Sequence, residues 1–330
     1  MSTISSETEP AQAWRTSMTP SLSWLRYGVF VVFVLMILVF GLLRPDAFLQ
    51  TSTFRSVLEN AAILAVVASG LSVVLAAGEF DLSFGAVASL GGAVAVFSMS
   101  SHGTGAVAAI IVALLVGLVW GSSTGLLVAY GRVPALIGTL AAGNVALGVE
   151  RAIMDDKTVY DGITKGYVNI AFGSWFSIPS VVLISILVVL AVGVLMSFTA
   201  FGRWIYAIGG NEEAARIAGI NTRRTRLLAF ALVAVCAGIA GILLTARAGS
   251  YYPSAGTGLL LPAYAACFLG WSASPGGRFH PVYTYFGVLF MGVLSTGLIM
   301  LQVPSYVDDL VQGVVLATAV LIARGVGRAS

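Results

Sequence analysis

The chain has 330 residues, of which 58% are hydrophobic and only 9% are charged, and its mean hydropathy is +0.97. Because soluble domains carry about 25% charged residues, this composition excludes a soluble enzyme or a soluble binding domain and indicates an integral membrane protein. The formal net charge of +3 is too small to indicate a nucleic-acid partner.

Ten apolar segments follow one another along the chain, separated by Gly, Pro or charged residues. Since a helix needs about 20 mostly apolar residues to cross a bilayer, we predict an all-α integral membrane protein with about ten transmembrane helices. One transmembrane domain at 27–325 lies between a polar tail at 1–26 and a short tail at 326–330. The predicted spans are 27–43, 55–77, 82–100, 105–130, 134–152, 179–199, 225–247, 258–271, 281–302 and 307–323.

The basic residues indicate how the chain is oriented, because cytoplasmic loops of membrane proteins carry an excess of Lys and Arg. With a cytoplasmic N-terminal tail, eleven of the 17 Lys and Arg residues face the cytoplasm and six face outside. We therefore expect both termini and the loop at 202–226 in the cytoplasm. The longest polar stretch on the outer side, 150–178, is predicted to be an exterior loop with a short surface helix.

Two stretches, 55–152 and 225–323, each contain four predicted spans with a Gly-rich break after the first. Strict alternation makes the first span of one stretch run inward and that of the other outward. This pattern is typical of two inverted four-helix halves, here after an N-terminal span, with a substrate path at the interface between the halves. Most of the 38 glycines are expected to pack helices, because small residues let backbones approach closely in lipid.

The first break carries two carboxylates, Glu79 and Asp81, within otherwise apolar sequence. Asp81 is well placed to cap a helix that begins at Leu82, because its side chain can accept the free N–H groups of the first turn. Glu79 has no such local role, and an acidic residue at a membrane helix break is a candidate functional residue. The equally weighted alternative is a solvated glutamate at the membrane surface.

Two amides, Asn60 and Asn144, lie within predicted spans. Amides inside membranes often hydrogen-bond between helices, so a structural role is favoured over contact with a ligand. Together with Glu79, Asp81 and Ser83, these amides are the candidate residues for a polar path through the membrane.

The most distinctive polar segment lies in the 202–226 loop, between two long apolar runs. A Gly-Gly-Asn entry at 209–211, two glutamates and a Gly exit at 219 predict a short amphipathic helix whose charges suit its dipole. Such a helix would present a compact polar knob to a partner; the alternative is a solvated connector that obeys the positive-inside rule. The candidate docking residues are Gly210, Asn211, Glu212, Glu213, Ala214, Ala215, Arg216 and Gly219.

Motifs for covalent or metal chemistry are absent from the sequence. There is no Gly-x-x-x-x-Gly-Lys-Ser/Thr phosphate-binding loop, the only histidines are His102 and His280, and Cys236 and Cys267 both fall in apolar segments. We therefore expect no catalytic residue, no metal site and no nucleotide hydrolysis by the chain on its own.

Four separated motifs occur in order along the chain. They are Asp81-Leu82-Ser83 with Gly85, Gly131-Arg132-Val133-Pro134 followed by Thr139-Leu140, the run from Ala207 through Asn221 to Arg247, and Ala255-Gly256-Thr257-Gly258. In order and spacing, these motifs resemble the ribose-type (carbohydrate uptake) ABC transporter permease family of bacteria. The similarity covers nearly all of 25–325.

The resemblance implies a permease subunit of an ABC importer in the bacterial cytoplasmic (inner) membrane, paired with a second copy or a paralogue. The 211–219 loop would act as a coupling helix that docks on a separate cytoplasmic ATPase, which carries the ATP and Mg²⁺. An extracytoplasmic substrate-binding protein would deliver a sugar or similar small polar solute. The chain itself would bind no cofactor.

Three alternatives remain open at this point. Related permeases that share the Asp-Leu-Ser break carry branched-chain amino acids or sugar-like signalling molecules. An ion-coupled secondary transporter would need a cation site, for which only Glu59, Glu79 and Asp81 are available in the spans and breaks. A passive channel is the weakest alternative, because it leaves the 207–226 loop without a purpose.

Overall fold

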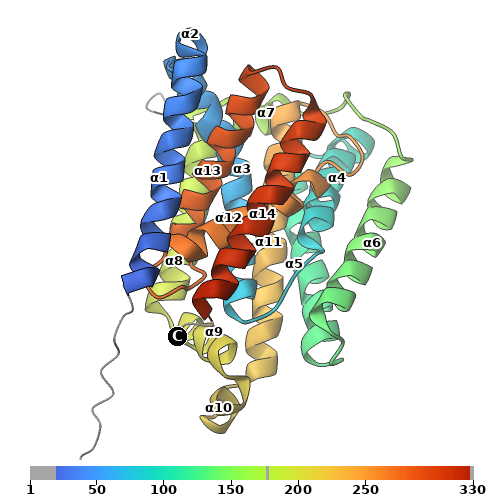
Figure 1. Ribbon diagram of the computed structural model, residues 1–330. Helices are drawn as coiled ribbons and strands as arrows, with labels where there is room; N and C mark the ends of the chain where they lie inside the picture. The colour runs from blue at the N-terminus through green and yellow to red at the C-terminus, as the bar shows by residue number, and fades with distance from the viewer. Residues whose placement is uncertain (1–19, 176–177, 328–330) are drawn as a thin grey trace, which may run out of the picture.

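The computed structural model describes residues 20–175 and 178–327, and it is almost entirely helical (Figure 1). Eight helices of this part are long and apolar enough to cross a membrane, and shorter apolar helices at Gly28–Leu43 and Thr257–Ala273 complete the ten predicted segments. The prediction of an all-α integral membrane protein is confirmed. Residues 1–19 and 328–330 of the predicted tails lie outside the described residues, and the remainder of the first tail begins helix α1.

The elements, in chain order, are α1 (Pro20–Leu43), α2 (Pro45–Phe48), α3 (Thr51–Ala76), α4 (Phe84–His102), α5 (Ala106–Ala129), α6 (Ala135–Met154), α7 (Lys165–Phe172), β1 (Ser174–Trp175), β2 (Ile178–Pro179), α8 (Ser180–Phe198), α9 (Ala200–Gly210), α10 (Glu212–Ile217), α11 (Thr222–Ala248), the 3₁₀ turn η1 (Thr257–Leu259), α12 (Leu260–Ala273), α13 (Pro281–Met300) and α14 (Ser305–Gly327).

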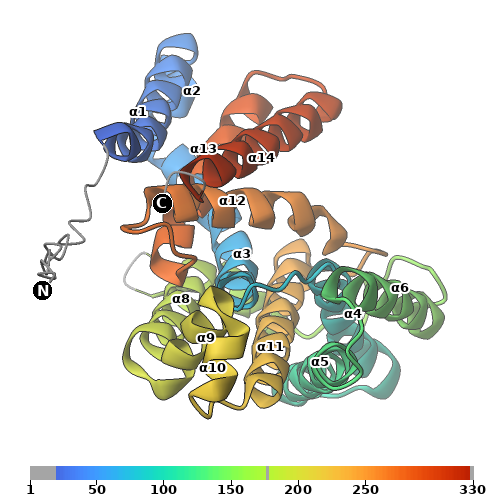
Figure 2. The ribbon, with the colours of Figure 1, turned by 60° about the horizontal axis from the view of Figure 1, so that its bottom comes forward.

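Helix α3 lies in the middle of the bundle, and α11 packs against it and against α4 and α5 (Figure 2). Small residues make these contacts. A Cβ added to Gly91 would lie 3.0 Å from the Gly238 Cα, and one added to Gly70 would lie 2.9 Å from the Val233 Cα. Apolar burial gives helices no advantage in lipid, so close backbone packing holds them together, as the glycine content predicts.

The two predicted halves correspond to α3–α6 and α11–α14, and equivalent helix pairs pack in both. Helix α4 contacts α5 and α6 as α12 contacts α13 and α14, and α11 contacts α4 and α5 as α3 contacts α12 and α13. Helices α3 and α11 start at opposite ends of the bundle, beside α2 and α10 respectively (Figure 1). This arrangement is the one that an inverted repeat predicts.

The segment predicted as an exterior loop, 150–178, contains the expected short helix, α7, followed by the antiparallel pair of β1 and β2. Helix α7 is not merely a surface element, because Tyr167 is fully buried. Its hydroxyl lies 2.6 Å from the Thr245 Oγ1 and donates to the Ile242 carbonyl at 3.2 Å. Tyr167 therefore fastens the exterior segment to α11.

The segment predicted as the 202–226 loop is mostly helical. Helix α9 begins after Thr199, whose side chain accepts a hydrogen bond from the Gly202 N–H, and only short connections separate it from α10 and α11. Helix α9 packs on the end of α3, where a Cβ on Gly209 would collide with the Ala76 carbonyl oxygen. The predicted loop is thus a packed helical unit from which α10 projects.

Replacing Gly241 with Val should lower the yield of folded chain. A Cβ at this position would collide with the Ala88 carbonyl oxygen of α4, and overfilling a packed interior costs about 1–3 kcal/mol. Gly148→Val is the matched control on α6, because no atom lies within 4 Å of a Cβ placed there. Gel filtration of fluorescently tagged variants in detergent measures both yields, and equal yields would contradict this packing account.

Candidate functional site

The first helix break, 77–83, lies between α3 and α4 and is closed by a buried carboxylate. Asp81 is 2% exposed, and its Oδ1 accepts hydrogen bonds from the Ser83 N–H at 2.6 Å and the Ser83 hydroxyl at 2.5 Å. The prediction that Asp81 caps a helix starting at Leu82 was wrong about the start, because α4 begins at Phe84 with Ser83 as its N-cap. Asp81 instead holds the turn that leads into α4.

Neighbouring helices satisfy the backbone of this break. The Asp81 N–H donates to the Tyr264 hydroxyl at 3.1 Å, and that hydroxyl donates to the Asp81 carbonyl at 2.8 Å. The Leu82 N–H donates to the Thr139 Oγ1 at 3.0 Å. These bonds satisfy the Asp81 and Leu82 N–H groups, which have no partner within α4. Non-helical backbone is tolerated in a membrane only where protein or water satisfies it.

The second helix break, 249–256, follows α11 and is held by a carboxylate from the other half. Glu150 is fully buried, and its Oε1 accepts hydrogen bonds from the Tyr251 hydroxyl at 2.9 Å and the Ser254 N–H at 2.8 Å. The Gly256 N–H donates to the Ser89 Oγ of α4 at 2.7 Å. The second break is thus bonded to α4 and α6, as the first break is bonded to α6 and α12.

The second break meets the first turn of α4 backbone to backbone, at Gly256 and Gly85. A Cβ on Gly85 would lie 3.0 Å from the Gly256 carbonyl oxygen, and a Cβ on Gly256 would collide with the Gly85 carbonyl oxygen. Side chains at these two positions are therefore excluded from this contact between the halves.

The predicted docking helix is α10, which projects from one end of the bundle (Figure 1). The Asn211 Oδ1 accepts a hydrogen bond from the Ala214 N–H at 2.9 Å, and Gly219 adopts a left-handed φ of 83° after the helix, as the Gly exit predicts. The Ile217 side chain is 79% exposed beside charged neighbours. Of the eight candidate docking residues, only Ala215 is buried, so the helix offers a mixed polar and apolar face to a partner.

A charge cluster joins α10 to the first break. Arg226, in the second turn of α11, donates two hydrogen bonds of 2.7 Å to the carboxylate of Glu212 at the start of α10. Its Nε also lies 2.9 Å from the Glu79 Oε1, a charge contact without hydrogen-bond alignment. Burial raises the pKa of Glu79, and the Arg226 charge opposes that rise. Glu79 is thus mostly buried and paired with an arginine, and it is not the solvated surface glutamate of the alternative.

The remaining candidate path residues lie apart from this cluster. Asn60 and Asn144 are exposed on the surfaces of α3 and α6, and neither side chain hydrogen-bonds within the described chain, so the expected structural role between helices is wrong for this single subunit. Glu59 is paired with Arg55 at 2.9 Å and with Arg247 at 3.6 Å. The Ser83 side chain bonds only to Asp81.

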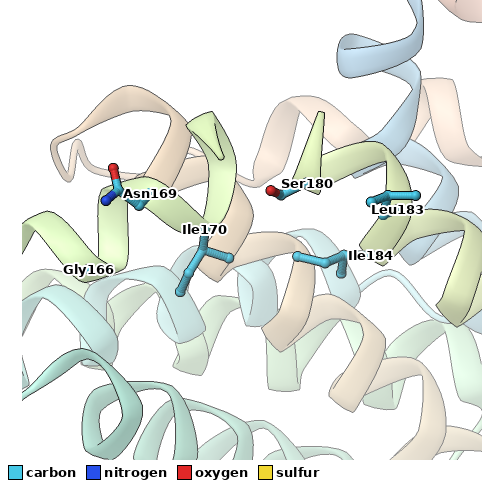
Figure 3. Close-up of a pocket in the computed structure, with 6 residues that line it drawn as sticks. All are labelled: Gly166, Asn169, Ile170, Ser180, Leu183 and Ile184. Carbon is cyan, nitrogen blue, oxygen red and sulfur yellow. The ribbon is translucent and has the colours of Figure 1, made fainter. Parts of the chain in front are cut away.

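Two hollows in the described chain differ in their relation to the breaks and the charge cluster. One, with a volume of about 380 Å³, opens beside the charge cluster and is lined by Glu79, Arg132, Glu212, Arg223 and Arg226 together with apolar residues of α5 and α6. The other, about 400 Å³, lies between α7 and α8 (Figure 3). Its six lining residues carry no charge, and it adjoins neither break. No group of His, Cys, Asp and Glu suited to a metal ion occurs within the described residues.

Sequence reasoning missed the residues that hold the breaks together: Ser89, Thr139, Glu150 and Arg226 as hydrogen-bond or charge partners, and Tyr264 as a clamp. Glu150 did carry a signal, because it is an acidic residue at the end of an apolar run. Tyr264 carried none beyond its aromatic character.

Comparison with known proteins identifies the family of the chain. The model of the family described as "Branched-chain amino acid transport system / permease component" matches residues 54–320. The chain belongs to this permease family. The ribose import permease protein RbsC of Escherichia coli (strain K12) is 36% identical to this permease over 298 residues, covering 88% of this chain and 91% of RbsC.

Two further relatives are the D-allose transport system permease protein AlsC and the L-arabinose transport system permease protein AraH of Escherichia coli (strain K12). AlsC is 32% identical over 304 residues, covering 92% of this permease and 93% of AlsC. AraH is 31% identical over 333 residues, covering 98% of this permease and 97% of AraH. The resemblance drawn from the four motifs is confirmed. A comparison with solved structures gives no significant match.

Asp81→Ala should destabilise the folded permease by about 1–3 kcal/mol, because the Ser83 N–H and hydroxyl would lose their buried hydrogen-bond acceptor. Asp81→Asn keeps an acceptor oxygen in the same place and should retain most of the stability. Thermal unfolding of the purified chain in detergent compares the two variants. An alanine variant as stable as the wild type would contradict the assigned role of Asp81.

Proposed function

We propose that this chain is the membrane-spanning permease subunit of an ABC importer and forms the path for a sugar. The observation that carries the proposal is the projecting helix α10, whose capped ends and exposed Ile217 suit it to dock on a separate protein. The names of RbsC, AlsC and AraH, all permeases for sugars, support a sugar as substrate over a branched-chain amino acid or a signalling molecule.

In this proposal, α10 docks on a cytoplasmic ATPase that binds ATP and Mg²⁺, while the permease itself binds no cofactor and catalyses no covalent step. A substrate-binding protein delivers the sugar from the opposite face, and a second permease copy or a paralogue completes the path. The excess of Lys and Arg on one side supports cytoplasmic termini, and the Escherichia coli relatives support a bacterial inner membrane. ATP binding by the partner then shifts the path between inward-open and outward-open states.

The two breaks are the proposed lining of the path. Gly256 of the second break meets Gly85, two residues beyond the first break, at the interface between the inverted halves, which is where substrate paths lie in transporters built from such repeats. The two glycines are in contact without being bonded to each other. Rocking one half against the other would therefore be sufficient to separate them and open the path.

The ion-coupled alternative is disfavoured by the partners of its three candidate acids. Glu59 and Glu79 are each held by arginine, and Asp81 is hydrogen-bonded by Ser83. A Na⁺ or H⁺ site needs carboxylate oxygens that are free to exchange the ion. An arginine partner stabilises the charged carboxylate and repels a cation.

Glu213→Arg should abolish capture of the ATPase by the tagged permease. Glu213 is exposed at the start of α10, where a negative charge suits the helix dipole, and reversing it places a positive charge on the docking face. Asp161→Arg is the matched control, since it makes the same charge change in the exposed segment between α6 and α7.

Pull-down from mild detergent, with the captured proteins identified and their ATP hydrolysis assayed, measures the effect. We expect the ATPase with the wild type and with Asp161→Arg, and its loss with Glu213→Arg. A wild-type chain that captures no ATPase would contradict the proposed function.

A further inference from the structure

Arg226 occupies the only position in the described chain at which a side chain forms ion pairs with both α10 and the first helix break. We propose that Arg226 is a positioning residue that transmits the movement of α10 to that break, through Glu212 on one side and Glu79 on the other. The inference rests on the proposed docking of α10 to an ATPase. It adds a specific route by which that docking changes the path.

The geometry of the cluster suits a mechanical link. The Glu212 carboxylate receives both terminal nitrogens of the guanidinium at 2.7 Å, so the start of α10 is fixed in orientation as well as in position. The Nε lies 2.9 Å from the Glu79 Oε1. Arg226 and Glu79 are only 21% and 17% exposed, so solvent screens their contact much less than that of a surface pair.

Arginine is the residue type that this position requires. Its planar guanidinium has five donors and can serve two carboxylates at once, whereas the compact ammonium group of lysine is a point charge on a flexible stem. The neighbouring cations do not make this link. Arg216 pairs with Glu213 within α10, both well exposed, and Arg223 lies over the ring of Tyr130.

A second contact couples the same two elements. At the end of α9, Gly209 meets the Ala76 carbonyl, and a Cβ on Gly78 would lie 3.7 Å from the Gly209 Cα. The unit of α9 and α10 therefore touches the first break by backbone packing and by charge. Packing resists approach of the two elements, while the arginine also resists their separation.

From the break, the route continues to the centre of the molecule. Glu79 is two residues from Asp81, whose backbone is clamped by Tyr264 of α12. The route runs through the Asp81 backbone and the Tyr264 hydroxyl, and a change of the neighbouring Phe80 side chain leaves these bonds in place. A shift of Glu79 therefore displaces a segment bonded to the second half, close to the contact of Gly85 with Gly256. The hollow of about 380 Å³ beside the cluster leaves room for such a shift.

The experiment uses a reporter thiol in the break, in the permease purified with its ATPase. Phe80→Cys introduces a thiol at a position that is 40% exposed, whereas the native Cys236 and Cys267 are buried and serve as the background in the unmodified chain. The rate of labelling by a water-soluble maleimide is measured without nucleotide and with ATP plus vanadate. Each variant is also scored for the amount of ATPase that co-purifies.

With the native Arg226, the labelling rate should depend on the nucleotide state. With Arg226→Ala, the ATPase should still co-purify, because the exposed docking face of α10 is retained, but the nucleotide dependence should fall by roughly five-fold or more, the lower range of coupling between linked sites. Arg226→Lys should give an intermediate value. Arg224→Ala, an exposed arginine two residues away on the same helix, is the matched control and should behave like the native chain.

Full nucleotide dependence in Arg226→Ala would overturn the inference while leaving the proposed function intact. Labelling that ignores nucleotide in the native chain with ATPase bound would also overturn it. If Arg226→Ala fails to assemble, Glu79→Gln supplies the test, because it removes one charge of the link without touching α10. Unchanged nucleotide dependence in that variant would overturn the inference, and weakened dependence would support it. A native chain that binds no ATPase would contradict the proposed function instead.

Discussion

The structure depends on one constraint, which is that buried backbone outside a helix must find its hydrogen bonds within the protein. The chain interrupts its helices twice and meets this requirement both times with side chains from elsewhere in the sequence. Tyr264 and Thr139 serve the first break, and Ser89 and Glu150 serve the second. The partners of the first break come from α6 and α12 and those of the second from α4 and α6, so the breaks and these helices form one bonded centre.

The same hydrogen bonds join the two halves. Each break is tied across to the opposite half, and the second break meets the first turn of α4 at glycines without intervening side chains. Around this contact the halves also pack through apolar side chains of α3, α4, α5, α11, α12 and α13. Alternating access, as proposed for this permease, would rock one half against the other about this interface.

A charge cluster lies at the end of the bundle from which α10 projects. Glu79 is far in sequence from Glu212 and Arg226, which are 14 residues apart, yet the three share one site between the first break, α11 and α10. Burial raises the pKa of Glu79 and favours its neutral form, whereas the positive charge of Arg226 favours the carboxylate. Glu79 and Arg226 therefore stabilise each other's charge. In the proposed link, the position of Arg226 depends on α10 through its ion pair with Glu212.

Much of this architecture was predictable from the sequence, because local composition determines which segments enter the membrane. The ten spans, the two Gly-rich breaks and the capped helix α10 are all encoded by residues close to one another in the chain. The clamp of Tyr264 on the Asp81 backbone and the partner of Glu79 were not predictable. Each joins residues far apart in sequence, and no periodicity reports such pairing.

The candidate path residues show the same division. Asp81 was found because an acid in an apolar break is conspicuous, whereas Glu150 was assigned to the edge of an exterior loop although it is fully buried against the second break. Asn60 and Asn144 were expected to be buried, because amides in spans usually are. They are exposed on this single chain, and the lipid or protein that covers them is not encoded in local sequence.

The most direct test of the account is uptake of radiolabelled ribose, allose and arabinose into proteoliposomes that contain the permease with its ATPase, supplied with the substrate-binding protein from outside. Uptake of at least one sugar should require ATP inside the vesicles and should persist when ionophores collapse the Na⁺ and H⁺ gradients. Uptake that proceeds without ATP, or that stops when the gradients collapse while ATP is held constant, would contradict the account.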